Sequence, residues 1–352
     1  MAKHQKWSSY QLYALPDEVI LKLFGFLEIK ELLLCGQVSK RLRAIANDES
    51  LWLKLNLWGR KVPYDFIEKV IGNGCQYLSL ANCDIQRSTG NSEPPSKLKY
   101  FNMSQLARYR KPQDLPKLLQ NCHSLQKLSV ANLPLDSEDI QYICQSGQTL
   151  QVLDLEACHI QLQNQAQLLQ DLFTNCANLT ELNIGSYANF LLDHQIQPLV
   201  DNLTPTILKL DLKYQYKFND EHVKKLVKRC NKLTHLDLRY TCITNDSMHS
   251  IIKHLNLSLE KLSVSKTKVD FATLIELKSM TSLKTLICCF SSNNAENIKN
   301  LKLKLPHIRI SQERYLFLAS PFDPVMNRSI DRDWIWEIKA KQQDLFPSET
   351  RD

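Results

Sequence analysis

A spacing of apolar residues that returns along most of the chain constrains its fold more than any other feature. In ten short segments, apolar side chains occupy the first, fourth and sixth positions, and from residue 98 to residue 305 the segment starts lie 22 to 29 residues apart. A period of this length indicates stacked units, because one unit cannot bury its own apolar face. The segments begin at Cys75, Leu98, Leu125, Leu150, Leu179, Ile207, Leu233, Leu259, Leu283 and Leu305.

The same spacing predicts the structure of each unit. The fourth and sixth positions are two residues apart, so in a strand both side chains point to one side, where a following helix covers them. Helix-start residues fit this order, since Asp220 and Asn245 each precede a segment of helical period. The pattern resembles leucine-rich repeats. It predicts an α/β solenoid of about ten repeats, with parallel strands on the concave face and helices on the convex face.

Cysteines occur at fixed places in these units. Cys122, Cys176 and Cys230 each stand three residues before a segment's first leucine, and Cys83 and Cys158 each follow a strand. This arrangement resembles the cysteine-containing class of leucine-rich repeat, in which the thiol is a small buried packing group. The total of 11 cysteines is odd and no C-x-x-C pair occurs. We therefore expect free thiols in a reducing compartment, and neither a disulfide framework nor a metal site.

A different pattern precedes the repeats. Residues 12 to 57 have the apolar period of three short helices, and Pro16 suits a first helical position because its missing N–H has no helical partner there. The segment resembles the F-box family in four strings, which are Leu-Pro-Asp-Glu-Val from residue 15, Lys-Glu-Leu-Leu from residue 30, Val-Ser-Lys-Arg from residue 38 and Ser-Leu-Trp from residue 50. One departure is Leu42, where many F-boxes have tryptophan.

This resemblance implies that the helical segment binds the adaptor subunit of a cullin-based ubiquitin ligase. The residues that would contact the adaptor are Leu15, Pro16, Ile20, Leu33, Val38 and Trp52. From the apolar period alone, the same residues also fit a second interpretation, the core of a small helical cap on the solenoid.

The residues that alternate with the buried leucines form three rows across the predicted concave face, because neighbouring parallel strands lie about 4.8 Å apart. The central row includes Asp211 and Asp237, whose like charges are tolerable where basic side chains surround them. Such a surface can hold a structured partner or a phosphorylated segment. The alternative is an ordinary solvated strand surface. The candidate target-binding residues are Lys209, Asp211, Lys213, His235, Asp237, Arg239, Lys261 and Ser263.

Residues 311 to 352 contain too many large apolar side chains for a disordered tail, so we expect them to pack. One interpretation is a cap on the last repeat. The other rests on the strings Leu-Pro-His-Ile from residue 305 and Ile-Trp-Glu-Ile-Lys from residue 335, which resemble the S-phase kinase-associated F-box receptor family. That resemblance implies a tail folded back along the concave face, where it forms a composite site with a small cyclin-dependent-kinase-subunit adaptor. It adds Trp334 and Trp336 to the candidate target-binding residues.

Composition argues against several other classes of protein. The formal net charge of +7 arises from 44 basic and 37 acidic residues, too little for a chain of 352 residues to require nucleic acid as its partner. No run of 18 apolar residues occurs, so we expect no membrane association. No G-x-S-x-G, H-E-x-x-H or P-loop motif is present. We therefore expect no catalytic site, no cofactor, and a location in the nucleus and cytoplasm.

These observations predict an F-box at 10–57, a solenoid at 58–310, a tail at 311–352 that packs on the solenoid, and a flexible insertion at 86–97. The expected function is that of a non-catalytic substrate receptor, which connects the adaptor and cullin scaffold of a ubiquitin ligase to a protein target. The resemblance suggests a phosphorylated cell-cycle inhibitor as the target. The alternative is a stand-alone leucine-rich-repeat binding protein without a ligase role.

Overall fold

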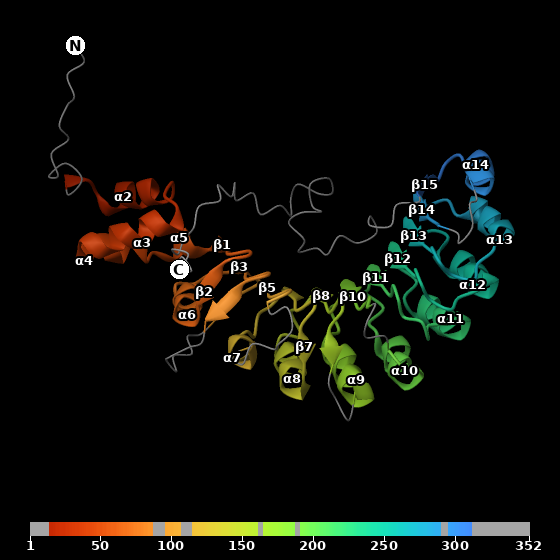
Figure 1. The fold of residues 1–352 in the computed structure, drawn as a ribbon, viewed down its shortest axis with the longest axis horizontal. Helices are drawn as coiled ribbons and strands as arrows, with labels where there is room; N and C mark the ends of the chain where they lie inside the picture. The colour runs from red at the N-terminus through yellow and green to blue at the C-terminus, as the bar shows by residue number, and fades with distance from the viewer. Residues whose placement is uncertain are drawn as a thin grey trace, which may run out of the picture.

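The computed structural model describes residues 14–86, 96–106, 115–160, 165–186, 191–289 and 295–311. Within these ranges a small group of helices leads into a curved stack of strands and helices, which follows the chain along an arc (Figure 1). Most of the predicted insertion at 86–97, and all of the predicted tail beyond Ser311, lie outside the described residues.

The helical group consists of α2 (Asp17–Phe24), α3 (Ile29–Val38), α4 (Lys40–Ala46) and α5 (Glu49–Trp52). Pro16 directly precedes α2, close to the start that the sequence predicts. Arg41 fastens α4 to this start, because its guanidinium pairs with Asp17 and also donates to the Leu15 carbonyl, both at 2.6 Å. The side chain of Ser39 accepts the Leu42 amide at the start of α4, which satisfies one of the unpaired amides of the first turn.

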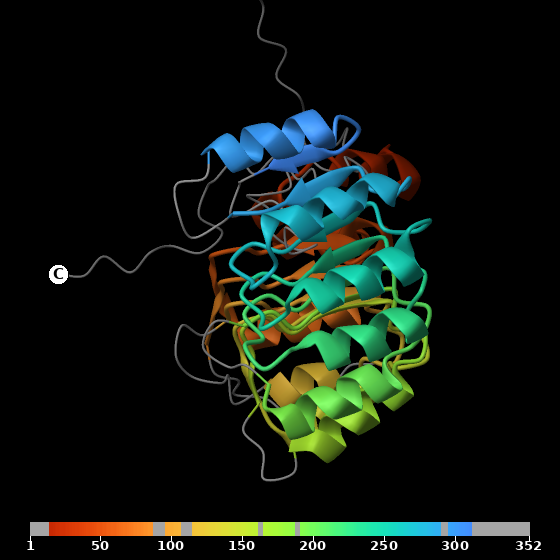
Figure 2. The same cartoon turned by 90° about the vertical axis from the view of Figure 1, so that its right-hand side faces the viewer.

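In the described part of the chain, eleven strands form one sheet, and neighbouring strands in it are parallel. The sheet lines the inside of the arc, and Figure 2 shows the helices stacked along its other side. The strands are β1 (Lys54–Asn56), β3 (Tyr77–Ser79), β5 (Tyr100–Asn102), β6 (Lys127–Ser129), β8 (Val152–Asp154), β10 (Glu181–Asn183), β11 (Lys209–Asp211), β12 (His235–Asp237), β13 (Lys261–Ser263), β14 (Thr285–Ile287) and β15 (Arg309–Ser311).

The convex side carries one helix after most strands. These helices are α6 (Tyr64–Gly72), α7 (Leu115–Gln120), α8 (Ser137–Gln145), α9 (Gln165–Asn175), α10 (Asp193–Asn202), α11 (Asp220–Arg229), α12 (Asn245–Leu255), α13 (Phe271–Ile275), which continues as the 3₁₀ turn η1 (Glu276–Ser279), and α14 (Ala295–Lys304). Two short parallel pairs, β2 (Lys61–Pro63) with β4 (Asp84–Gln86) and β7 (Pro134–Leu135) with β9 (His159–Ile160), join adjacent repeats. The α/β solenoid is confirmed, and α11 and α12 begin at Asp220 and Asn245 as predicted.

The sheet begins one repeat earlier than the sequence pattern indicated. Strand β1 pairs in parallel with β3, and its Leu55, with Leu57 just after the strand, is buried in the same core as the later leucines. Trp52 stands three residues before Leu55, so Trp52, Leu55 and Leu57 repeat the spacing of the other segments. The first strand therefore lies inside the range 10–57 that was predicted for the helical domain.

The turns after the strands are alike in most repeats. Among the described residues, seven other than glycine have positive φ, between 54° and 64°, including Tyr214 at 64° and Tyr240 at 56°. Such backbone is uncommon for bulky side chains. It is held here because the Tyr214 amide donates to the Arg239 carbonyl at 2.8 Å, and the Tyr240 amide to the Ser265 carbonyl at 3.0 Å.

The cysteines that the repeat pattern singled out are packing groups. Cys83, Cys122, Cys158, Cys176 and Cys230 are buried, and all 11 cysteines of the chain are free. The thiol of Cys158 donates to the Val130 carbonyl of the preceding repeat at 3.0 Å. Burial raises the pKa of Cys122 to about 11, so this thiol stays protonated at neutral pH. Within the described ranges, no helix is both long and apolar enough to cross a membrane.

Candidate functional site

The helical group leaves several apolar side chains in contact with water. On α2, Val19 and Leu23 are 40% and 45% exposed, and on α3, Leu34 and Val38 are 54% and 67% exposed. In the turn after α2, Phe26 is 87% exposed. The two residues of each helical pair are four positions apart, so they share one side of their helix. We call these five residues the exposed apolar set, and large apolar side chains exposed on one small group of helices are candidates for contact with a partner protein.

The predicted adaptor contacts divide into two groups. Pro16 and Val38 are exposed, and Leu15 and Leu33 are half-buried, so these four are accessible to a partner. The prediction that Ile20 and Trp52 contact the adaptor is wrong, because their exposed fractions are 0% and 2% and both belong to the chain's own core.

Trp52 is fixed from several sides. Its indole nitrogen donates to the Ala46 carbonyl at 2.7 Å, and the Lys69 ammonium of α6 lies 5.9 Å from the centre of its ring. The ring of Phe66, also on α6, meets it edge-on at 6.3 Å. Trp52 therefore joins the helical group to the first repeat, which is a packing role.

A pocket of about 120 Å³ adjoins this junction. Leu33, Gln37 and Arg43 from α3 and α4 line it, together with Trp52 and Lys69. A volume of this order holds one apolar side chain or a few water molecules. Leu33 therefore borders a depression at the edge of the helical group.

The concave face has the three rows that the sequence predicted. The first row is confirmed by the pairing of Lys209 with His235 and of His235 with Lys261, and the central row by the pairing of Asp211 with Asp237 and of Asp237 with Ser263. The third row follows the strands, where the carbonyls of Lys213 and Arg239 accept amides from the preceding repeat.

The central row has a structural task that the sequence analysis missed. In six repeats the side-chain oxygen of its Asp or Asn accepts the amide two residues further on, at Asn56, Asn102, Asp154, Asn183, Asp211 and Asp237. Asp and Asn form this local turn readily because their short side chains reach the backbone just ahead. The signal in the sequence is the restriction of this position to Asn, Asp and Ser in nine successive repeats, from residue 56 to residue 263.

The prediction that Asp211, Asp237 and Ser263 contact a target is therefore corrected. All three have an exposed fraction of 0%, and Lys213 contacts Asp211 while Arg239 contacts Asp237. The hydroxyl of Ser263 has no hydrogen-bond partner among the described residues. These residues belong to the wall of the solenoid rather than to its accessible surface.

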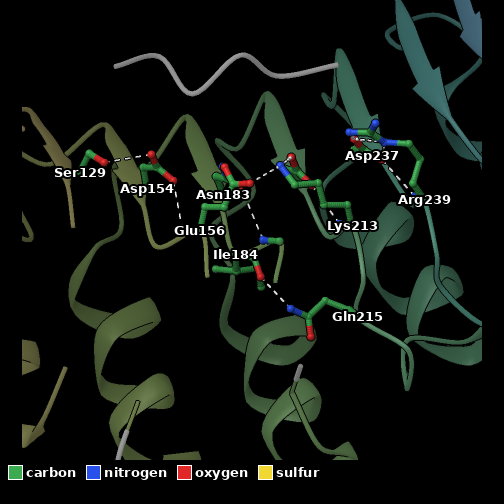
Figure 3. A network of polar contacts seen from close by, with 11 residues as sticks. Ser129, Asp154, Glu156, Asn183, Ile184, Lys213, Gln215, Asp237 and Arg239 are labelled. Carbon is green, nitrogen blue, oxygen red and sulfur yellow. Dashed lines mark hydrogen bonds and ion pairs between the residues drawn. The ribbon is translucent and has the colours of Figure 1, made fainter. Parts of the chain in front are cut away.

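Lys213 and Arg239 act as internal counter-ions for this row (Figure 3). The guanidinium of Arg239 forms an ion pair with Asp237, in which Nη2 and Nε lie 2.6 Å and 2.9 Å from the carboxylate. The ammonium of Lys213 lies 3.1 Å from Asp211 and 2.7 Å from Glu156. Because their side chains are only 13% and 10% exposed, Lys213 and Arg239 are already occupied, and their predicted contact with a target is also corrected.

The reach of Lys213 depends on a glycine. Glu156 lies two repeats before Lys213, and Gly185 occupies the same position in the repeat between them. A Cβ atom at Gly185 would stand 2.6 Å from Cγ of Lys213. The missing side chain therefore gives the lysine its path. The network continues through Asn183, whose side-chain Nδ2 donates to the Glu156 carboxylate at 3.1 Å. It also includes Ser129, whose hydroxyl donates to the Asp154 carboxylate at 2.9 Å.

Asp211 is unusual because burial raises its pKa by more than the ion pair with Lys213 lowers it. Burial raises its pKa to about 7 from an ordinary 3.8, with Asp237 adding to the rise and Lys213 opposing it. A carboxyl whose pKa is raised in the fold keeps a proton that the unfolded chain releases, so folding is weakened as pH rises from 3.8 to about 7.

The replacement Asp211→Asn tests this charge. An asparagine keeps the turn-forming oxygen, as at Asn183, but cannot ionise. We expect the stability of the natural chain relative to Asp211→Asn to fall as pH rises from 3.8 to about 7, because in this interval the unfolded natural chain releases a proton from Asp211 that the folded chain keeps, whereas asparagine has no proton to release. Thermal unfolding midpoints at a series of pH values measure the difference. If the stability of the natural chain relative to Asp211→Asn rose over the same pH interval, the attraction of Lys213 for the charged carboxylate would outweigh the effect of burial.

Three of the predicted target contacts stay accessible. Lys209, His235 and Lys261 are half-buried in the first row, and Lys209 pairs with Glu181 at 2.9 Å. Burial, then Lys261 and Lys209, lower the pKa of His235 to about 4, so this imidazole is neutral at physiological pH. The contact of these three with a target stays a prediction. Trp334 and Trp336 lie outside the described residues.

Comparison with known proteins agrees with this two-part architecture. Residues 65–343 match the family model of the SKP2 LRR domain, and residues 12–58 match the F-box-like model. The F-box protein dre-1 of Caenorhabditis elegans is 43% identical over 51 residues, which are 14% of this chain and 5% of dre-1. The chain thus spans only a small part of the length of that relative. Since the first match covers well over half of the chain, the protein belongs to the F-box proteins that carry an SKP2-type leucine-rich-repeat domain.

Proposed function

We propose that this chain is the substrate-recognition subunit of a cullin-based ubiquitin ligase of the SCF type. One observation carries the proposal, which is that one chain presents two chemically different surfaces at separate places. The exposed apolar set lies on α2, on the turn after it and on α3, and a polar concave face lines the large parallel sheet of the solenoid. An F-box joined to leucine-rich repeats supports a receptor of this general kind.

The exposed apolar set gives the helical group its partner surface. Val38 and Leu34 stand one turn apart on α3, and Val19 and Leu23 one turn apart on α2. Burying a fully exposed side chain of this kind contributes about 1.5 to 3 kcal/mol, and each of these side chains, 40% to 67% exposed, contributes the corresponding part of that value when a partner covers it. A ligase adaptor that covers several of them is therefore held firmly without any charged contact. Pro16 and Leu33 add to the same surface.

The solenoid supplies the target surface, and its role is to place the target rather than to act on it. A receptor fixed to the adaptor and cullin raises the local concentration of target lysines near the ubiquitin-charged enzyme, which accelerates transfer. Lys209 and Lys261 of the first row suit a phosphorylated segment of a cell-cycle regulator. We extend the proposal to a small cyclin-dependent-kinase-subunit adaptor as a further partner and to a location in the nucleus and cytoplasm.

Reconstituted transfer of ubiquitin tests the proposal. Extract proteins that the full chain captures are offered to a mixture of adaptor, cullin and ubiquitin-charged enzyme, with and without the chain. We expect the captured proteins to be modified only when the chain is present, and capture to decrease after phosphatase treatment of the extract. Capture without modification would instead favour the stand-alone binding protein.

A further inference from the structure

The end of the concave face next to the helical group differs chemically from the rest. On β1, β3, β5 and β6, twelve outward positions make up the three rows, of which two are lysine, three are aromatic and the others are Asn, Ser or Ala. None of the twelve is acidic. On the next four strands, the same twelve positions include five carboxylates, which are Asp154, Glu156, Glu181, Asp211 and Asp237. The first four strands therefore form a separate surface.

The aromatic and basic side chains of this surface stack on one another along the first row. The Lys54 ammonium lies 5.0 Å from the centre of the Tyr77 ring, and the rings of Tyr77 and Tyr100 meet edge-on at 4.5 Å. On the far side, the Lys127 ammonium lies 5.1 Å from the centre of the Tyr100 ring. A lysine ammonium above an aromatic ring is attracted by the electrons of the ring. The side chains of this row are therefore already stacked on one another before a partner binds.

Accessibility decides which of these residues a partner can touch. Lys54 is exposed, and Tyr77 and Tyr100 are half-buried. Trp58 lies in the turn directly after β1, at the third-row position of this repeat, and is 46% exposed. Lys127 is only 6% exposed, so it acts through its charge from behind Tyr100. We call Lys54, Trp58, Tyr77 and Tyr100 the aromatic-basic surface.

We propose that the aromatic-basic surface binds an extended segment of a partner protein that carries acidic and apolar side chains. Lys54 supplies charge for a carboxylate, and the tyrosine and tryptophan rings supply flat apolar area. Trp and Tyr dominate binding energy at interfaces because they offer large contact areas at low entropic cost. With no acid on the surface, an acidic segment meets no repulsion there.

The dimensions favour a peptide over a nucleic acid. The four strands span three inter-strand steps, about 14 Å, which is the length of roughly four extended residues. A DNA duplex carries a charge about every 1.7 Å along its axis and needs several basic contacts. Of the four residues of the aromatic-basic surface, Lys54 alone is basic. The surface thus suits a short acidic segment.

Four fluorescein-labelled probes test this proposal by fluorescence anisotropy with the full chain. They are a peptide of repeated Glu-Leu-Pro, the same peptide with lysine for glutamate, the same peptide with serine for leucine and proline, and oligothymidylate. We expect the first probe to bind about tenfold more tightly than each of the others. Equal binding of the lysine peptide, tighter binding of oligothymidylate, or no binding of the first probe would overturn the proposal.

Substitutions locate the binding on the chain. We expect Lys54→Glu and Trp58→Ala each to weaken binding of the first probe about tenfold. The matched controls are Lys224→Glu, which makes the same charge change on the exposed side of α11, and Leu257→Ala, which removes an apolar side chain that is 80% exposed. Equal effects of the test and control variants would place the probe elsewhere. The variant Leu34→Glu/Val38→Lys should bind the probe normally, which separates this proposal from the ligase role.

Discussion

The double replacement Leu34→Glu/Val38→Lys is expected to weaken binding of the ligase adaptor by about 100-fold, which corresponds to about 2.7 kcal/mol. Leu34 and Val38 are 54% and 67% exposed, so both are free to be covered by a partner. A glutamate and a lysine four residues apart on α3 keep the helix, because this order of charges stabilises it slightly. The variant therefore removes apolar surface without unfolding the domain. Titration calorimetry with purified adaptor measures the loss.

Leu303→Glu is the matched control for this change. Leu303 is 73% exposed on α14, at the opposite end of the solenoid, so its replacement should leave adaptor binding within about twofold. The melting temperatures of both variants should remain close to that of the natural chain. Adaptor binding that is unchanged in the α3 variant would assign the exposed apolar set to another partner.

Trp52→Ala is expected to destabilise the junction of the helical group and the first repeat by about 3 to 5 kcal/mol. Trp52 is 2% exposed, and its replacement leaves a cavity as well as an unpaired Ala46 carbonyl. In a stacked protein each repeat depends on its neighbours, so the loss should be concentrated in β1 and β3. Amide hydrogen exchange of these strands measures the free energy of local opening.

Trp58→Ala provides the comparison, since Trp58 is 46% exposed and does not belong to the hydrophobic core. The replacement of Trp58 should lower the free energy of local opening by less than about 1 kcal/mol. If Trp52→Ala lost adaptor binding while exchange in β1 and β3 stayed unchanged, the indole would be an adaptor contact after all.

The fold could be predicted from the sequence because stacking imposes its own spacing. A buried leucine at a given position must lie beside the leucine of the next repeat, so the register of Lys209, His235 and Lys261 follows from counting. Trp52 shows the limit of this reasoning. It belongs to two patterns, the end of the helical motif and the first apolar position of an additional repeat, and only the packing with Phe66 and Lys69 decides between them.

The accessible part of the concave face could not be predicted in the same way. Alternation along a strand indicates that Asp211 and Asp237 point away from the leucine core, but it does not reveal which neighbours then cover them. Lys213 reaches across Gly185 to Glu156, and Arg239 folds onto Asp237, and both paths depend on three-dimensional side-chain positions. The exposure of Val19 and Leu34 was hidden for a related reason, since apolar residues at helical spacing usually mark a core.

Hydrogen exchange of the full chain with and without purified adaptor tests most directly whether the helical group is the docking domain of a ligase receptor. We expect slower exchange in α2 and α3, which carry most of the exposed apolar set, and unchanged exchange in β11, β12 and β13. Protection confined to the solenoid strands, or no protection anywhere, would contradict it.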